Sequence, residues 1–325
     1  MGLVALLATS CNKNKDQQNA SLQSYGEQME VVAGEFDDNS EKVTLGTDNR
    51  LYFESGEACA LFYINTTTPA NSAWLTCTTT GGQVDGITTW TPMGGGTLPE
   101  VESRDRYAFS PAGTCTYDGK AYVTTDSTFF IENRATFHIP AHQTYVENSC
   151  PTEGFFMASK LEAGQSSFYF RNICGLLCLQ IYSPMNRTVT SIEVTDKDGK
   201  HLSGDVSLKI DKVNPTTLRS LYNNYNPDNA SYMQTLADYI EESGYCVSNA
   251  GATMTLDCGG SDGVQVGTSS GSATKFYITL RPLALRKGFV VKVNCTGGYS
   301  FTQQTSKSNI IGPNVIKKMP AFNIK

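Results

Sequence analysis

The most constraining feature of this chain is a repeated pattern of short runs in which apolar and polar residues alternate. In the clearest run, residues 202–210, an apolar residue or glycine occupies every second position, and polar residues lie between them. A period of two is that of a β-strand, whose successive side chains point to opposite faces of a sheet. Gly, Pro, Asn and Asp interrupt the runs, and Thr, Ser and aromatic residues are frequent, which is typical of an extracellular all-β protein. The sequence therefore predicts an all-β fold.

A length of 325 residues suits two domains, each large enough to bury its own core. The alternation begins near residue 42 and is broken around residues 152–164. We expect a signal segment at 1–10, a polar tether at 11–41 and two β-sandwich domains at 42–163 and 164–325.

Four segments carry specific predictions. Cys59–Ile64 is apolar at consecutive positions and predicts a strand that is buried on both faces. Residues 168–182 predict one long strand that opens the second domain. Asp196–Lys200 holds turn formers between two alternating runs and predicts a β-hairpin. Ser231–Ser243 has apolar residues at i, i+3, i+4 and i+7, which predicts one short helix inserted between strands.

The first residues resemble the end of a bacterial lipoprotein signal. A short apolar run, Gly2–Ser10, stops at Cys11 and gives way at once to polar residues. The run is well below the roughly 20 apolar residues that span a bilayer, so it predicts a removed segment. Cys11 is then the lipidation site, with palmitate among the acyl groups, although the run lacks a basic start. The alternative is a disordered apolar N-terminus.

The remaining cysteines number nine, because the chain has ten and Cys11 belongs to the signal. An odd set cannot pair completely within the chain, and no C-x-x-C spacing occurs among the nine. Several of them fall on the apolar phase of a predicted strand, where cysteine behaves as a small hydrophobe. We favour buried thiols over disulfides, and one or more bridges remain the alternative.

The charge distribution argues against a nucleic-acid partner. The formal net charge is −6, and Lys and Arg are scattered along the chain. Two serine patterns also occur in contexts that do not suit catalysis. Ser269 lies in a G-x-S-x-G pattern that precedes a predicted strand, whereas a nucleophile elbow leads into a helix. Ser272 and Lys275 match S-x-x-K, but side chains three apart diverge in an extended run.

Metal ligation finds equally little support. His138 and His142 are four residues apart, but Pro140 between them favours an extended chain. Asp196 and Asp198 resemble the start of a calcium loop whose later ligands are missing, so turn chemistry explains them better. We therefore predict a protein that is not an enzyme and has no cofactor, catalytic residue or metal site.

A glycan-binding surface lipoprotein is the alternative from another functional class. Trp74, Trp90, Tyr107 and Tyr117 could form aromatic platforms for sugars or host ligands. Ordinary core or surface packing explains these four residues at least as well.

Several motifs, taken in order, resemble the fimbrillins, which are lipoprotein-derived subunits of type V pili of the FimA and Mfa type. Each motif is weak alone, because it describes packing or a turn, and the resemblance runs through most of the chain. The motifs are Thr-Ser-Cys11-Asn-Lys, Leu45-Gly-Thr-Asp-Asn-Arg50, Ile139-Pro-Ala-His-Gln143, Gly154-Phe-Phe-Met-Ala158, residues 170–182, Leu202-Ser-Gly204, Phe276-Tyr-Ile-Thr-Leu-Arg-Pro282 and Gly288-Phe.

The resemblance implies two transthyretin-like, Greek-key β-sandwiches in a subunit exported as an outer-membrane lipoprotein and displayed in a fimbrium that supports adhesion. A trypsin-like protease would cut after Arg50, with Lys42 as a second possible site, and release the strand that holds Val43 and Leu45. Other fimbrial subunits would be the partners, joined by donor-strand exchange. The resemblance assigns the donor strand to Val315, Ile316, Met319, Phe322 and Ile324.

Overall fold

The computed structural model describes strands in the first part of the chain and most of the chain from residue 129 onward. The described residues are 28–32, 58–63, 75–78, 86–92, 106–110, 115–123, 129–151, 156–161, 167–169, 171–209, six residues between 231 and 240, 244–260, 262–313 and 315–325.

The first half forms a large mixed sheet, here called the β2 sheet. Its order is β10-β1-β4-β3-β2-β5-β9-β11. Only the pair β1 and β10 is parallel. The strands are β1 (Gln28–Val32), β2 (Ala58–Tyr63), β3 (Leu75–Thr78), β4 (Gly86–Pro92), β5 (Arg106–Ser110), β9 (Met157–Leu161), β10 (Ser167–Tyr169) and β11 (Arg171–Asn172).

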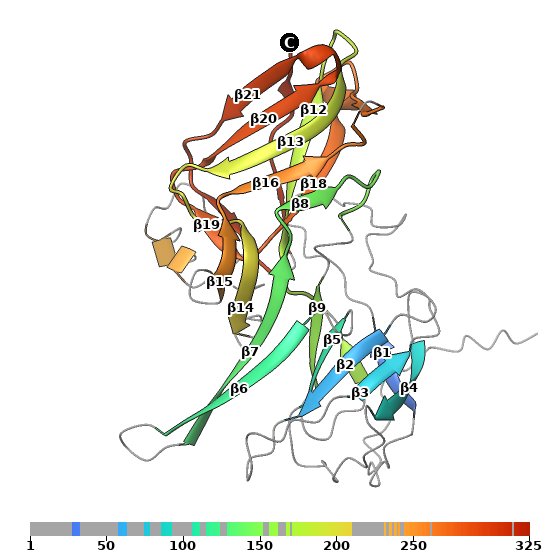
Figure 1. Ribbon diagram of the computed structural model, residues 1–325, viewed down its shortest axis with the longest axis vertical. Helices are drawn as coiled ribbons and strands as arrows, with labels where there is room; N and C mark the ends of the chain where they lie inside the picture. The colour runs from blue at the N-terminus through green and yellow to red at the C-terminus, as the bar shows by residue number, and fades with distance from the viewer. Residues whose placement is uncertain are drawn as a thin grey trace, which may run out of the picture.

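A second sheet, the β7 sheet, runs in the order β15-β14-β7-β6 and extends from the lower end of the molecule to its middle (Figure 1). Strand β7 is long enough to reach from the β2 sheet toward the second half. Phe137 of β7 packs against Phe156, with ring centroids 4.7 Å apart, which joins the β7 sheet to the β2 sheet. The strands are β6 (Cys115–Val123), β7 (Phe129–Ile139), β14 (Ser203–Lys209) and β15 (Gly244–Gly251).

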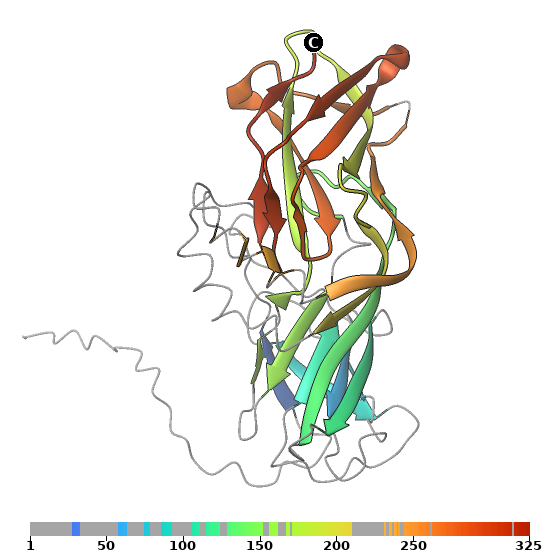
Figure 2. The same ribbon diagram turned by 90° about the vertical axis from the view of Figure 1, so that its left-hand side faces the viewer.

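Two further sheets pack face to face in the second half (Figures 1 and 2). The β13 sheet has the order β21-β20-β13-β16-β8, with β17 beside β13, and the β12 sheet has the order β18-β12-β23, with β24 also beside β12. Strands β19 (Leu283–Leu285) and β22 (Asn309–Ile311) form a small pair. The other bounds are β8 (His142–Thr144), β12 (Gly175–Tyr182), β13 (Thr188–Asp196), β16 (Thr253–Asp257), β17 (Val264–Gln265), β18 (Thr274–Leu280), β20 (Phe289–Cys295), β21 (Ser300–Gln304), β23 (Ile316–Lys318) and β24 (Phe322–Asn323), with 3₁₀ turns η4 (Ser270–Ser272) and η5 (Thr296–Gly298).

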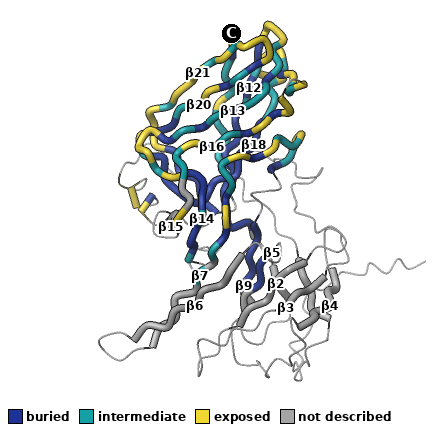
Figure 3. The backbone as a smooth tube through the Cα atoms, viewed as in Figure 1, coloured by how far each residue is buried: buried dark blue, intermediate teal, exposed yellow. Residues whose placement is uncertain are grey.

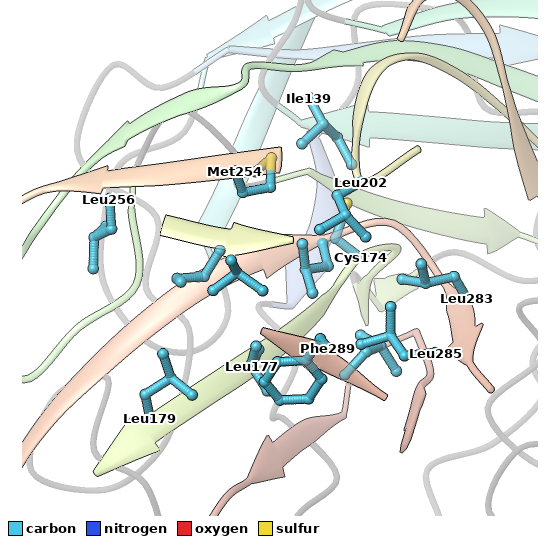
Figure 4. Packing of buried hydrophobic residues seen from close by; sticks show 14 of the residues in the cluster. Ile139, Cys174, Leu177, Leu179, Leu202, Met254, Leu256, Leu283, Leu285 and Phe289 are labelled. Carbon is cyan, nitrogen blue, oxygen red and sulfur yellow. The ribbon is translucent and has the colours of Figure 1, made fainter. Parts of the chain in front are cut away.

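The space between the β12 and β13 sheets is filled by branched apolar side chains (Figure 4). Figure 3 shows that the buried residues run along the middle of the strands, while exposed residues gather at the loops and along β21. Burying each such side chain contributes about 1.5–3 kcal/mol. The core residues include Leu177, Leu179, Ile192, Val194, Met254, Leu256, Phe276, Ile278, Phe289 and Val293.

These sheets confirm the prediction of an all-β sandwich fold. The division into two domains at residue 163 stays a prediction. Two strands that precede this residue pair with strands that follow it. Strand β14, which follows it, pairs with β7, which precedes it, in the register Gly204↔Ile139 to Lys209↔Arg134. Strand β8, which precedes it, pairs with β16.

The prediction of one long strand over residues 168–182 is wrong. The segment is divided into β10, β11 and β12, and only β12 belongs to the new sheet. The side chain of Asn172 interrupts it, because its Oδ1 accepts a hydrogen bond of 2.7 Å from the amide of Cys174. Such a local side-chain bond turns the backbone out of one ladder and into the next.

The prediction of a hairpin around Asp196–Lys200 is also wrong, although the turn itself is present. Asp196 Oδ2 accepts hydrogen bonds from the amides of Asp198 (3.0 Å) and Lys200 (2.7 Å), and Gly199 has a φ of 73°. However, β13 pairs with β16, β17 and β20, and β14 pairs with β7 and β15. The turn therefore connects two different sheets.

The predicted helix at Ser231–Ser243 lies partly within the described residues, and those of its residues that are described are helical. Ala237 and Ile240 face the core and are 2% and 0% exposed. On the outer side, Arg286 donates to Gln234 Oε1 and to Asp238 Oδ1, both at 2.7 Å. Apolar contacts and an Arg-centred polar contact thus attach this segment to the sandwich. No helix among the described residues is both long and apolar enough to cross a membrane.

Five cysteines have described side chains, and all five are buried thiols, as the sequence favoured. Burial raises the pKa of the Cys150 thiol to about 12. Burial, together with the charges of Asp257 and Cys295, does the same for Cys258. A thiol with such a pKa stays protonated and unreactive in the folded protein. The five are Cys150, Cys174, Cys178, Cys258 and Cys295.

Gly175, the first residue of β12, offers a test of this packing. A Cβ there would lie 2.4 Å from the carbonyl oxygen of Gly312 and 2.5 Å from Cγ2 of Ile311. We expect Gly175→Ala to lower the free energy of unfolding by about 1–3 kcal/mol, because the strands must separate. Gly271→Ala is the control, since nothing lies within 4 Å of a Cβ there. Equal urea midpoints for the two variants would contradict the close approach of β12 to Gly312.

Candidate functional site

Strand β12 is the central strand of its sheet, and most of its residues are buried. Its first five residues are buried on both faces. On one side it pairs antiparallel with β18 over seven residue pairs, from Gly175↔Leu280 to Ile181↔Thr274. On the other side it pairs parallel with β23 and β24. The sheet is therefore narrow, and both of its edges lie next to the core.

The outer edge of β18 is closed by a side chain. Gln143 Nε2 donates to the carbonyl of Thr279, and Gln143 Oε1 accepts from the amide of Thr279, each at 2.9 Å. These two bonds reproduce those that an adjacent antiparallel strand would make to one residue. Gln143 lies in β8, at the edge of the β13 sheet, and is 1% exposed. The primary amide therefore joins the two sheets of the sandwich along this side.

An aromatic contact reinforces the same side of the sandwich. The ring of Tyr145 lies 5.2 Å from the ring of Phe276 in β18. Burial raises the pKa of Tyr145, and the charges of Glu147 and Cys258 raise it further, so its hydroxyl stays neutral. The β18 edge is thus covered by both apolar and hydrogen-bonded contacts.

The other edge of the sheet is occupied by residues 315–325, here called the edge segment. The amide of Leu176 donates to the carbonyl of Val315 at 2.9 Å, and the amide of Met319 donates to the carbonyl of Cys178 at 2.9 Å. Further along, the amide of Ile324 donates to the carbonyl of Tyr182 at 3.0 Å. Main-chain bonds to a single strand therefore hold the segment at its start, in its middle and near its end.

The side chains of the edge segment close the core. Ile316 is 5% exposed and Ile324 is fully buried. Val315, Met319 and Phe322 are partly buried and pack against the core cluster. These are the five residues that the resemblance assigns to a donor strand, and the structure places all of them on one edge of their own sheet.

A gap divides the edge segment into two short strands. Pro320 lies between β23 and β24 and has no amide hydrogen to donate. The side chain of Gln180 bridges this place, because its Nε2 donates to the carbonyl of Met319 at 2.7 Å. Because of this bond, the carbonyl of Met319 keeps a hydrogen-bond partner where the strand is interrupted.

Tyr299 and Phe301, which lie just before and within β21 of the opposite sheet, hold the end of the edge segment. The rings of Phe301 and Phe322 stack with centroids 6.3 Å apart. The hydroxyl of Tyr299 donates to the carbonyl of Lys325. The guanidinium of Arg187 lies 3.7 Å from the centre of the Tyr299 ring. The edge segment thus lies between β12 of one sheet and β21 of the other.

The residues assigned to signal, processing and strand release lie outside the described part of the chain. These are Cys11, Lys42, Val43, Leu45 and Arg50, and their roles stay predictions. The same holds for Trp74, while Trp90, Tyr107 and Tyr117 lie on β4, β5 and β6 with only their backbone described.

The serine patterns lie in local structure that does not fit a nucleophile elbow. Ser269 precedes the 3₁₀ turn η4, and its Oγ lies 3.1 Å from that of Ser272. The chain then enters β18, as the sequence predicts, where Lys275 is part of the ladder with β12. The two hydroxyls therefore serve a turn.

The histidines and aspartates that could have suggested a metal are engaged in strand and turn contacts. His138 lies on β7, with Nδ1 2.7 Å from Asp205 Oδ1 on the adjacent strand β14. Asp198 accepts from Lys287, a contact that holds the pKa of this carboxyl below its usual range. Among the described residues no group of three or more His, Cys, Asp or Glu side chains could hold a metal ion.

Sequence reasoning missed the two glutamines that stand in for main-chain groups. Gln143 lies in the run His-Gln-Thr, which is polar throughout and gives no sign of which residue points inward. Gln180 occupies a polar phase of β12 and looks like an ordinary exposed position. Only the approach of a second strand edge from elsewhere in the chain reveals what each amide bonds.

No family model matches the sequence, and no curated protein matches it. Among solved structures, the chain is similar to a "putative cell adhesion protein" from Bacteroides uniformis, with 12% identity, 92% of each chain covered and a TM-score of 0.45. A second "putative cell adhesion protein", from Bacteroides ovatus, has 10% identity over 88% of this chain and 89% of that chain, with a TM-score of 0.42. The tip fimbrial protein Mfa3 from Porphyromonas gingivalis has 8% identity over 85% of this chain and 81% of that chain, with a TM-score of 0.33.

The last of these proteins comes from the group of fimbrial subunits that the sequence motifs resemble. Since all three TM-scores lie below 0.5, the choice of a function for this chain rests on its own residues.

The packing of the edge segment can be tested at its most buried residue. We expect Ile324→Ala to lower the free energy of unfolding by about 2–5 kcal/mol, because it leaves a cavity beside β12. Lys325→Ala is the matched control at the neighbouring exposed residue and should change stability by less than about 0.5 kcal/mol. Chemical denaturation measures both. If the two variants are equally stable, the segment does not contribute to the core.

Proposed function

We propose that this protein is a structural subunit of a cell-surface fimbria, exported as a lipoprotein and joined to its neighbours by donor-strand exchange. The edge segment of one subunit leaves its own sheet and pairs with a neighbouring subunit. The strand before Arg50 is removed by a trypsin-like protease to make room for it. Head-to-tail addition of this kind does not close on itself and gives a filament, which supports adhesion.

The observation that carries the proposal is the position of the edge segment. It forms ladder bonds with one strand only, β12, and among the described strands none pairs with its outer side. Its departure therefore breaks no other described ladder. It also carries apolar residues at both ends, Ile316 and Ile324, which a groove in another subunit can bury again.

The free energy of strand exchange favours a joint between subunits that is made by a transferred strand. A segment of this kind buries its apolar side chains and satisfies its main-chain groups both before and after transfer. The departing segment opens the β12 edge, and the groove left by the strand that proteolysis removes exposes further apolar surface and unpaired amides, so strands that fill both places recover these costs. Processing at Arg50 thus supplies the driving force in this scheme.

Lipidation at Cys11 completes the proposal. The lipid brings the precursor to the outer membrane, and a cut after Arg50 releases both the lipid and the first strand. A subunit that kept this bond would remain attached to the membrane through Cys11, as an anchor or as a surface protein that binds glycans or host ligands.

Complementation by a peptide tests whether the edge segment is exchangeable. We expect a variant without residues 314–325 to be less stable than the full chain, since it exposes the edge of β12. A peptide of residues 315–325 added in trans should bind it and raise its melting temperature, measured by scanning fluorimetry. The same peptide with Ile316→Asp and Ile324→Asp is the control and should not bind, because it would bury two charges. A variant that does not bind the unmodified peptide would show that the β12 edge cannot receive this segment from another molecule.

Limited proteolysis tests the proposed activation. Trypsin should cut the full chain after Arg50, and the product should move from monomer to concentration-dependent oligomers in sedimentation velocity. Arg50→Ala should stay monomeric under the same treatment, whereas Lys42→Ala should behave like the unmodified chain. N-terminal sequencing identifies the cut. A product that begins at residue 51 and remains monomeric would rule out this role for Arg50.

A further inference from the structure

The two edges of the β12 sheet are closed by different chemistry. The edge segment closes the β12 side with an extended piece of chain, which exchange could remove and replace. Gln143 closes the β18 side with one amide group on a strand that belongs to the opposite sheet. The β18 side therefore cannot open by releasing a strand.

We propose that Gln143 is a specificity-determining residue that seals the β18 edge against strand addition, so that this sheet offers an incoming strand only its β12 edge. The role of the β12 edge rests on the function proposed above, while the sealing of the β18 edge does not depend on it. Without this seal the sheet would offer two edges to an incoming strand. A subunit with two such edges would branch or aggregate.

The geometry supports a seal more than a general stabilising contact. Thr279 is opposite Leu176 in the register with β18, and both of its main-chain groups are bonded by Gln143, so they point away from β12. These are the groups that an added strand would use. A primary amide is the side chain best suited to this task, because it donates and accepts in the spacing of a peptide group.

The charge state at this place is also consistent with a permanent seal. The seal consists of the neutral amide of Gln143 and the main chain of Thr279, and the ring of Tyr145 lies near Phe276 of the same strand. Burial raises the pKa of Tyr145, so its hydroxyl stays protonated beside this edge. The seal itself therefore carries no charge, in contrast to an ion pair.

The test uses the full, uncut chain, in which both edges are closed. A fluorescein-labelled peptide of residues 315–325 should not bind the unmodified chain. It should bind Gln143→Ala in a saturable way, measured by fluorescence anisotropy, because the variant leaves the main chain of Thr279 open to a strand. Hydrogen exchange at the Thr279 amide should become at least about tenfold faster in this variant.

Gln143→Met and Gln143→Glu are the matched variants. Met keeps the length of the side chain but removes both hydrogen bonds. Hydrogen exchange at the Thr279 amide should therefore rise as in the Ala variant. The Met variant also provides this measurement if the Ala variant folds poorly. Glu keeps the acceptor for the Thr279 amide and should give an intermediate rate. Unchanged exchange at Thr279 in the Met variant, or peptide binding to folded Gln143→Ala no better than to the unmodified chain, overturns the proposal.

The outcome separates this inference from the proposed function. If the chain without residues 314–325 binds the peptide and uncut Gln143→Ala does not, exchange at the β12 edge stands and the seal is wrong. If uncut Gln143→Ala binds the peptide and the truncated chain does not, the seal stands and exchange at the β12 edge is wrong.

Discussion

Each strand at the edge of a sheet leaves main-chain amides and carbonyls that need partners, and in this protein that need is greatest around β12. A sheet of two long strands, β18 and β12, has no interior strand that is remote from an edge. Its inner face is also the floor of the core, with Leu177, Leu179 and Phe276 fully or almost fully buried. The residues that pair with the two edges therefore also exclude water from the core.

The two edges are covered by different groups, Gln143 on the β18 side and the edge segment on the β12 side, and these differ in what must move to release them. On the β18 side, Gln143 is anchored in a different sheet and bonds one residue, so its release requires the sheets to separate. On the β12 side, the edge segment forms a ladder of its own and is clasped by Phe301 and Tyr299 from the opposite sheet. This second closure consists of main-chain bonds to one strand together with buried side chains. The function in assembly proposed above uses this difference between the two edges.

The sequence predicted much of the fold because period-two patterns report local geometry. The run at residues 202–210, which became β14, was recognisable from its alternation, and the apolar run at Cys59–Ile64 became β2. The errors arose where partner choice mattered. Asp196 forms the turn that its sequence suggests, yet the strands on either side of it join different sheets. Asn172 breaks a run that is apolar enough to continue, because its side chain captures the amide of Cys174.

For the candidate site, the sequence by itself determined that residues 315–325 form an extended, partly apolar segment, since those properties depend only on the residues and their spacing. The tertiary structure decided which strand the segment lies beside, in which direction, and which side chains cover it. It also decided the role of Gln143, because Thr279, whose main-chain amide and carbonyl it bonds, lies 136 residues away in sequence. A period of two specifies which face of a strand is apolar and contains no information about which strand will be its neighbour.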